Sequence, residues 1–246
     1  MSEEIAKNKI LIGTRFFERE PNKIEIIEGF VRQALACSDQ VLVAINTEED
    51  KTEAINHHRL KLPGVEVFGV TPWGKFIPAL NTLISKAKLK GADSILLASA
   101  EMRFSQEEFS QLKIYLDENT LVVGAVLPGH DFQEGERVGN GRTVPWNTFS
   151  LWNLEYLSRT GFPLISDAFF NGDKSGVEEV TTIALLQKMY PFLKAKLIKL
   201  PGITRETDSW DKWRLERHQR ELENRIRCPE AQMKVFNILS PKIIHI

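Results

Sequence analysis

The chain has 246 residues, enough for one large α/β domain, and its charges are balanced, with 32 Lys and Arg against 33 Asp and Glu. Because this balance leaves no excess of positive charge to neutralise phosphates, nucleic acid is not an expected partner. Two cysteines, Cys37 and Cys228, stand far apart without a CxxC spacing. This spacing argues against a disulfide framework and against a structural zinc site.

The N-terminal sequence MSEEIAKNKI is polar and charged. No later stretch reaches the roughly 18 to 20 apolar residues that span a bilayer. We therefore expect no transmembrane segment and a protein that stays in the cytoplasm, where its thiols remain reduced. A homo-oligomer is compatible with this sequence.

Apolar runs and helical patterns alternate through the first half of the chain. The runs are apolar on both faces, which suits strands of a parallel sheet covered by helices, and Ser105 is the expected N-cap of one helix. The predicted strands cover residues 9–13, 40–45, 65–70, 94–98 and 121–127, and the predicted helices cover residues 24–36, 78–89 and 106–116. The alternation predicts a doubly wound, Rossmann-like and mostly parallel α/β sheet, with helices on both faces and ligands beyond the carboxyl ends of the strands.

The second half of the chain is less regular. Residues 128–144 are rich in Gly and charged residues without a period, which predicts a loop or β-hairpin near the site. A helix is predicted at residues 178–188 and a late strand at residues 196–200. Residues 210–227 predict a highly charged C-terminal helix with a narrow apolar stripe.

Four separate parts of the sequence carry a resemblance to a known family. Residues 40–52 (QVLVAINTEEDKT) form an apolar strand followed by D-x-T, and residues 71–81 (TPWGKFIPALN) join Gly-Lys to Ala-Leu-Asn. Residues 95–102 (ILLASAEM) are a strand that ends in Ser-Ala-Glu. Residues 145–162 are rich in aromatic side chains, and residues 176–180 read GVEEV. In this order the segments resemble the GT-A fold of family-2-like glycosyltransferases, which use nucleotide diphosphate sugars.

This resemblance implies a donor site in the first half of the chain. Asn46 takes the place of a family carboxylate that contacts the nucleotide base, while Asp50 and Thr52 match the D-x-T. Gly74 lets the backbone approach the ligand, and Lys75 supplies a point charge for phosphate. The residues expected to bind the nucleotide sugar are Thr14, Asn46, Asp50, Thr52, Gly74, Lys75, Asn81 and Ser99.

The resemblance also implies a metal. Relatives end the strand at residues 95–102 in D-x-D, whose carboxylates hold a divalent ion on the diphosphate, and here the triplet reads Ser99-Ala100-Glu101. Mn²⁺ and Mg²⁺ take hard oxygen ligands, so Glu101 is the expected ligand. His218, from the C-terminal helix, is the expected second ligand.

On the acceptor side, the resemblance points to Trp146 and Asn147. In GVEEV, the second carboxylate of the pair acts as the base in relatives, which assigns that role to Glu179 beside Glu178.

The resemblance as a whole implies a single GT-A-like domain over residues 1–246, with a nucleotide-binding half at 9–127. Residues 128–246 would supply the acceptor-side half and the C-terminal helix.

The expected function is transfer of a sugar, hexosyltransferase-like and with inversion, from a nucleotide diphosphate sugar to an acceptor that the resemblance does not name. Transfer needs cations for the departing diphosphate and a base for the acceptor hydroxyl. Lys75, a metal at Glu101, Arg205 or His218 would supply the positive charge. Glu179 would take the proton.

Each of these residues also has a structural interpretation. Asp50 and Thr52 suit helix caps, and a glutamate pair is favoured at a helix start by the helix dipole. Trp146 and Trp152 suit a core or interface. These interpretations stay open at the level of sequence.

Two other functions compete with glycosyl transfer. Ser99 in place of the first carboxylate and Asn46 in place of another suggest a catalytically silent GT-A-like domain that binds a nucleotide or assists assembly. A nucleotidyltransferase ranks lower, because such enzymes carry a Gly-rich loop after the first strand and this chain has only Gly13 there.

Overall fold

The computed structural model describes most of the chain. The described residues are 8–16, 23–46, 60–74, 76–167, 177–205, 216, 225–226 and 228–246. The site predictions for Asp50, Thr52, Lys75 and His218 lie outside these residues, as does most of the helix predicted at 210–227.

Within the described part of the chain, nine strands form one sheet in the order β3-β2-β1-β4-β8-β6-β9-β11-β7. The strands are β1 (Ile10–Phe16), β2 (Val41–Asn46), β3 (Val65–Val70), β4 (Ser94–Ala98), β6 (Thr120–Ala125), β7 (Gly135–Val138), β8 (Phe149–Asn153), β9 (Lys194–Ile198) and β11 (Lys242–His245). A second, two-stranded sheet pairs β5 (Met102–Arg103) with β10 (Thr204–Arg205).

Most neighbours in the large sheet are parallel. β3, β2, β1 and β4 run parallel to one another, and so do β6, β9 and β11. β8 is antiparallel to both β4 and β6, and β7 is antiparallel to β11. The predicted doubly wound, mostly parallel sheet is confirmed.

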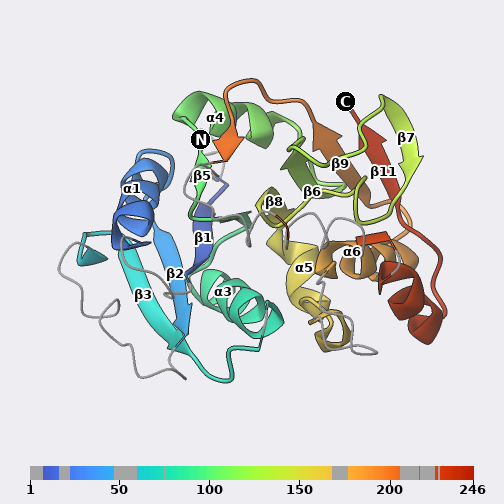
Figure 1. Ribbon diagram of the computed structural model, residues 1–246, viewed down its shortest axis with the longest axis horizontal. Coiled ribbons are helices and arrows are strands. Elements are labelled where there is room, and N and C mark those ends of the chain that lie inside the picture. Colours follow the sequence, from blue (N-terminus) through green and yellow to red (C-terminus); the bar gives the residue numbers. More distant parts are fainter. Residues whose placement is uncertain are drawn as a thin grey trace, which may run out of the picture.

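Helices cover both faces of this sheet (Figure 1). Helices α1 and α4 lie on one face, and α3, α5 and α6 lie on the other. Their bounds are α1 (Lys23–Leu35), α3 (Ile77–Leu89), α4 (Gln106–Ile114), α5 (Leu154–Thr160) and α6 (Glu178–Met189). Residues 164–166 form a 3₁₀ turn, and residues 228–236 are also helical. None of the helices in the described residues has the length and apolar character to cross a membrane.

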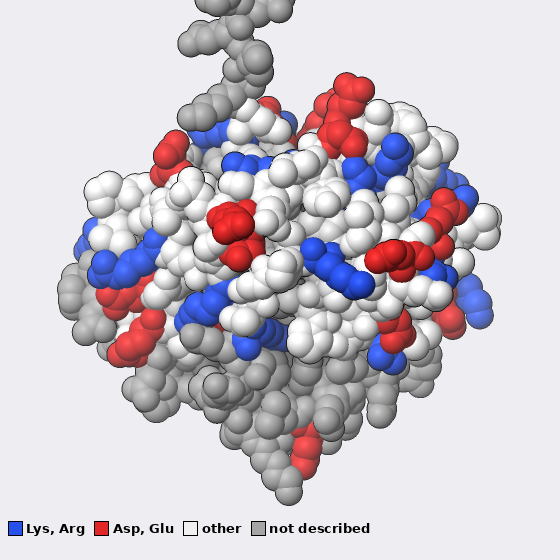
Figure 2. Space-filling model, turned by 90° about the horizontal axis from the view of Figure 1, so that it is seen from above, with Lys and Arg blue, Asp and Glu red and all other residues white. Residues whose placement is uncertain are grey.

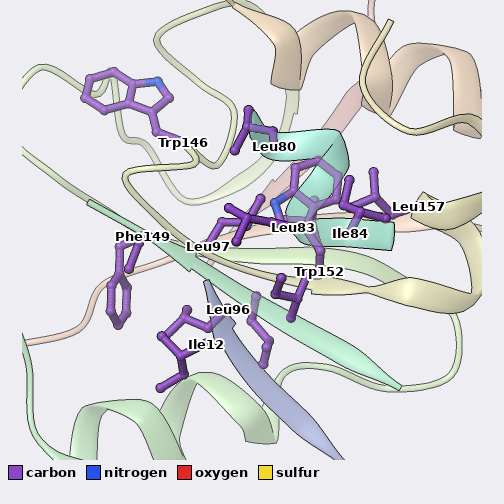
Figure 3. Packing of buried hydrophobic residues seen from close by; sticks show 14 of the residues in the cluster. Ile12, Leu80, Leu83, Ile84, Leu96, Leu97, Trp146, Phe149, Trp152 and Leu157 are labelled. Carbon is purple, nitrogen blue, oxygen red and sulfur yellow. The ribbon is translucent and has the colours of Figure 1, made fainter. Parts of the chain in front are cut away.

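Strand β8 carries core side chains to both faces of the sheet. Phe149 packs against Phe104, with ring centroids 4.9 Å apart, whereas Trp152 meets Phe162 edge-on at 5.3 Å. Figure 3 shows the Trp152 ring among residues of α3 and α5, including Leu83. Fully burying a Leu or Phe side chain contributes about 1.5–3 kcal/mol, so burial on both faces of β8 stabilises the packing of helices on the two sides of the sheet.

Local capping fixes helix α4 as the sequence predicts. The Ser105 hydroxyl accepts the N–H of Glu107 over 3.1 Å, and the Glu108 carboxylate accepts the N–H of Ser105 over 2.7 Å. This reciprocal arrangement satisfies backbone donors that a helix start otherwise leaves open. The predicted N-cap at Ser105 is confirmed.

Three details of the second half differ from the sequence prediction. The strand within residues 128–144 pairs with β11 at the end of the chain instead of forming a local hairpin. The late strand begins two residues earlier, at Lys194. Residues 145–162, expected only as an acceptor-side segment, contain the central strand β8 and helix α5.

Charged side chains of both signs are interspersed on the face shown in Figure 2. Lys and Arg do not gather there into one continuous area. This mixed pattern matches the balanced composition of the chain.

Candidate active site

The carboxyl ends of β1 and β4 meet at one edge of the sheet, because the two strands are parallel neighbours. β1 brings Thr14 and Arg15 to this edge. β8 runs the opposite way, so its beginning lies at the same edge, where the N–H of Ser99 donates to the carbonyl of Thr148 over 2.9 Å. Segments far apart in the sequence therefore converge here.

Glu178 and Glu179 open helix α6 at this convergence and are buried, with exposed fractions of 5% and 4%. Asn147 holds both carboxylates. Its backbone N–H donates to Oε1 of Glu179 over 2.7 Å, and its Nδ2 donates to Oε1 of Glu178 over 3.1 Å. The Asn147 Oδ1 in turn accepts the indole N–H of Trp152 over 2.9 Å. The structure thus brings together the predicted acceptor-side asparagine and both predicted catalytic glutamates.

Both glutamates are buried, and this burial changes the proton chemistry of Glu179. Burial raises the pKa of Glu179 to about 8, with the charge of Glu178 acting in the same direction. Arg225 and the N–H of Asn147 oppose this rise. A carboxyl with a pKa near neutrality can exchange a proton at working pH, which an acid–base catalyst requires.

Arg15 is the cation at the end of β1 that these carboxylates surround. Burial lowers its pKa, while the charges of Glu178, Glu179 and Asp167 raise it. Its guanidinium lies 4.6 Å from the centroid of the Phe76 ring. Because a guanidinium stays protonated, Arg15 offsets part of the negative charge of this edge. The sequence interpretation gave Arg15 no role, since a single arginine after a strand has no distinguishing pattern.

Asp167 is a second residue that the sequence interpretation missed. Its Oδ1 accepts the backbone N–H groups of Phe76 and Ile77 over 2.6 and 2.8 Å, so a residue ninety positions away caps helix α3. Helix α3 has no side-chain cap at its own N-cap, Phe76, and this gap was the available signal. Gly74 passes close by with φ of +60°, and a Cβ there would collide with the Asp167 carboxylate.

Glu101 lies where a metal ligand was expected, but its partner is a cation. Arg205 approaches Oε2 of Glu101 with Nε at 3.3 Å and Nη2 at 3.2 Å. The side chain of Ala100, between Ser99 and Glu101, has no ligand atom. Among the described residues, no three His, Cys, Asp or Glu side chains come together as a metal site. A guanidinium on the only carboxylate of the triplet repels a second cation, so these residues do not fit the expected divalent metal.

Three other residues that were predicted to bind the nucleotide sugar have different surroundings. Thr14 is buried, and its hydroxyl has no hydrogen-bond partner within the described structure. Asn46 ends strand β2, opposite Val70 of β3. Asn81 exchanges two hydrogen bonds with the backbone of Phe162, at 3.0 and 2.8 Å, so its amide holds α3 to the chain after α5.

Trp146 lies in the core, which is the structural alternative given for it above. His130 stacks on the indole at a centroid distance of 3.8 Å, and the Arg225 guanidinium lies 4.2 Å from its ring. The indole N–H donates to the Gly141 carbonyl over 2.8 Å. Both the faces and the polar atom of this ring are therefore used inside the protein.

A surface pocket of about 410 Å³ lies at the opposite edge, near the amino ends of β4 and β6. Two of its carboxylates bind other parts of the chain. Asp93 accepts the N–H of Lys9 over 2.8 Å, and Asp117 pairs with Lys196 at 2.7 Å. The candidate catalytic and cationic side chains described above thus lie at the carboxyl edge of the sheet and not around this pocket.

Comparison with known proteins supports the fold. No family model matches the chain, and no curated protein sequence matches it. The structure is similar to the mannosyltransferase PcManGT from Pyrobaculum calidifontis in complex with GDP-Man and Mn²⁺. The TM-score is 0.54 at 16% identity, over 79% of this chain and 55% of that one.

A second similar structure is glucosyl-3-phosphoglycerate synthase from Mycobacterium tuberculosis, in complex with Mn²⁺, UDP and phosphoglyceric acid. Here the TM-score is 0.57 at 12% identity, over 89% of this chain and 76% of the other. Both neighbours are GT-A nucleotide-sugar glycosyltransferases, so the chain has the GT-A fold and the predicted resemblance is confirmed at that level. The chain spans about half the length of PcManGT.

Proposed function

We propose that the protein is a glycosyltransferase that moves a hexose from a nucleotide diphosphate sugar to an acceptor hydroxyl, with inversion at the anomeric carbon. The observation that carries this proposal is the buried Glu178 and Glu179 pair held by Asn147 at the carboxyl edge of the sheet. Open α/β sheets bind ligands at this edge. The neighbours of the same fold are complexes with GDP-Man and with UDP, which supports a nucleotide donor.

The donor is assigned to the ends of the first strands and the loop before α3. Asn46, Asp50 and Thr52 would contact the nucleoside, and Gly74 with Lys75 would approach the diphosphate. Support comes from the strand order, which places β2, β1 and β4 side by side with their carboxyl ends at one edge. Thr14 and Ser99 belong to the same edge. Asn81 would act only by holding α3 in place.

Glu179 is assigned as the base for the acceptor hydroxyl. Its carboxylate is fixed by a backbone N–H, so it needs no reorganisation to reach a defined position, and its pKa of about 8 lies near working pH. Removal of the acceptor proton by ionised Glu179 would leave the oxygen free to attack the anomeric carbon. Glu178 would keep the pKa of its neighbour high and orient Asn147.

The departing diphosphate needs positive charge that is already in place when its own charge grows. Arg15 and Arg205 are two of the described cations at this edge. Asn147 would help to position the acceptor. No step of this mechanism runs through a metal, because the residues after β4 do not fit one.

The test is a thermal-shift screen of nucleotide sugars on the full chain, followed by a transfer assay with the donor that stabilises the fold most. We expect one donor class to raise Tm in a saturable manner and to be consumed with an acceptor. A nucleotide that binds without being turned over with any acceptor would favour the silent GT-A-like domain instead. Absence of binding by every nucleotide sugar would refute the proposal.

A further inference from the structure

The turn that follows strand β4 is held rigidly at the proposed diphosphate end of the site. The N–H of Met102 donates to the carbonyl of Ser99 over 3.0 Å, which closes the turn around Glu101. The guanidinium of Arg103 donates to the carbonyls of Ala100 and Met102 over 3.2 and 3.0 Å. Glu101 therefore projects from a backbone that three hydrogen bonds fix, two of them from the Nη1 of Arg103.

Arg205 reaches this turn through strand pairing. β10 is antiparallel to β5, and the register places Arg205 opposite Met102, the residue after Glu101. The two side chains are mostly buried, with exposed fractions of 21% for Arg205 and 11% for Glu101. The pairing of β10 with β5 thus places the Arg205 guanidinium beside the Glu101 carboxylate, so this contact is part of the fold and not a chance surface pair.

The chemistry of the pair differs from that of a metal site. A divalent ion at Glu101 would have to displace Arg205 or bind beside its positive charge, and both are unfavourable at such short range. A guanidinium has five N–H donors in a fixed fork and stays charged at all physiological pH values, so it can hold a carboxylate and a phosphate together.

We propose that Arg205, positioned by Glu101, takes the place of a divalent metal at the donor diphosphate, so that nucleotide binding needs no Mn²⁺ or Mg²⁺. This inference rests on the proposed function and specifies how its donor is held. The diphosphate oxygens would accept N–H groups of Arg205. Glu101 would then act as a positioning residue, since it orients the guanidinium without touching the donor.

The experiment measures Kd for UDP and for GDP by calorimetry on the full chain, once in EDTA and once with excess Mn²⁺. We expect the Kd of the better nucleotide to differ by less than about twofold between the two conditions. Arg205→Gln should weaken binding in EDTA by about tenfold or more, because a charge-assisted contact to phosphate is lost. Arg205→Lys, which keeps the charge but not the fork, should fall between these values.

Loss of Arg205 also takes a cation away from the mostly buried Glu101, so the single variant can lose stability. The double variant Glu101→Gln/Arg205→Gln removes the charge of Glu101 as well and serves as the matched control. We expect it to recover Tm but not nucleotide affinity. Glu101→Gln alone should weaken nucleotide binding in EDTA less than Arg205→Gln does, because an amide oxygen still accepts the guanidinium N–H and keeps Arg205 partly positioned.

Three outcomes would overturn the inference, and they are distinguishable. Binding that requires Mn²⁺ and disappears in Glu101→Gln would show that Glu101 is a metal ligand, while leaving the proposed glycosyltransferase intact. Folded protein that binds neither nucleotide in either condition would remove both the inference and the proposed function. A double variant that regains affinity together with Tm would show that Arg205 has only a structural role.

Discussion

Glu66 on strand β3 and Glu179 on helix α6 are glutamates whose pKa values move in opposite directions. Glu66 is a third exposed and pairs with Lys86 and Lys90 at 2.6 and 2.8 Å. The hydrogen bonds from Lys86 and then from Lys90 lower its pKa. Glu179 is buried beside another carboxylate, and its pKa rises to about 8.

The difference follows from where each residue lies in the sheet. Glu66 lies on the outer strand β3, where the long side chains of Lys86 from α3 and of Lys90 from its C-cap reach it and water solvates the rest of its charge. Glu179 lies at the convergence of strand ends, where α6 and the chain before β8 cover it. One carboxylate is arranged for stability, and the other retains its proton near neutral pH. This difference supports the proposal that Glu179, and not Glu66, does acid–base work.

The largest expected effect is that of Glu179→Gln on turnover. The amide keeps the size of the side chain and can accept the N–H of Asn147, but it cannot take a proton. With donor and acceptor identified by the screen, kcat should fall by roughly 10² to 10⁴ while donor Kd stays nearly constant. Single-turnover kinetics with a direct binding measurement separates the two quantities.

Glu178→Gln is the neighbouring control. Its amide can still accept Nδ2 of Asn147, and neighbouring side chains on a helix point about 100° apart, so it should retain most activity. Equal loss at both positions would mean that the pair acts as a unit. Full activity in Glu179→Gln would remove the base from the proposed mechanism.

The second prediction uses pH. The folded state binds a proton at Glu179 up to about pH 8, whereas an ordinary glutamate loses it near pH 4.5, so the folded state holds more protons between these values. The free energy of unfolding should therefore decrease as pH rises through this window, by at most about 1.4 kcal/mol per pH unit from this group. Chemical denaturation at pH 5, 6, 7 and 8 should show this slope in wild type and a shallower slope in Glu179→Gln.

The ionisation of Glu179 lowers the stability of the folded state, but it should raise kcat. The base must be deprotonated to act, so kcat should rise with pH until Glu179 is ionised, near pH 8. Parallel slopes for stability in wild type and Glu179→Gln would contradict the raised pKa. A rate that does not change between pH 6 and 9 would contradict the role as base.

The third prediction concerns a carboxylate at the same edge that serves the backbone. Gly74→Ala places a Cβ against the Asp167 carboxylate at a residue with positive φ, and should destabilise the protein by about 1–3 kcal/mol. Gly91 is the matched control, because its φ is also positive and nothing lies within 4 Å of its Cβ position. Gly91→Ala should cost about 1 kcal/mol.

The difference between the two alanine variants isolates the contact with Asp167. Urea unfolding of both variants measures it directly. An equal loss in both would show that only the backbone conformation matters at Gly74, and that Asp167 moves aside without cost. Asp167 would then be a poor candidate for holding the loop before α3.

The elements that the sequence predicted are those whose signal is local. Continuous burial of β2 and β4 on both faces gives uninterrupted apolar runs, and the cap of α4 lies within three residues of the helix start. Strand β8 was missed because the sequence FSLWN is short and its place between β4 and β6 depends on distant partners. Periodicity cannot report such pairing.

The candidate active site shows the same difference between features with a local sequence signal and contacts that depend on distant residues. The glutamate pair at the start of α6 was predictable from its motif, and Asn147 from the segment before it, although no pattern indicated that they bond to each other. Asp167 caps a helix ninety residues away, and Glu101 meets Arg205 across 104 positions. These contacts arise only when the sheet brings the segments together.

The smallest expected effect is that of Glu66→Gln, which tests the other side of the comparison. The variant removes two ion pairs, but both lysines and the glutamate are about a third exposed, so solvent screens the interaction and the loss should be roughly 0.2–1 kcal/mol. Because the folded pKa of Glu66 is lowered, its contribution is present above the ordinary glutamate pKa and disappears as pH falls through the folded value. Wild type and Glu66→Gln should therefore differ in stability at pH 7 and converge at acid pH, and transfer activity should be unaffected because β3 lies at the outer edge of the sheet. A difference that grows on acidification, or a loss of turnover comparable to that of Glu179→Gln, would mean that the two glutamates do not have the separate roles assigned to them.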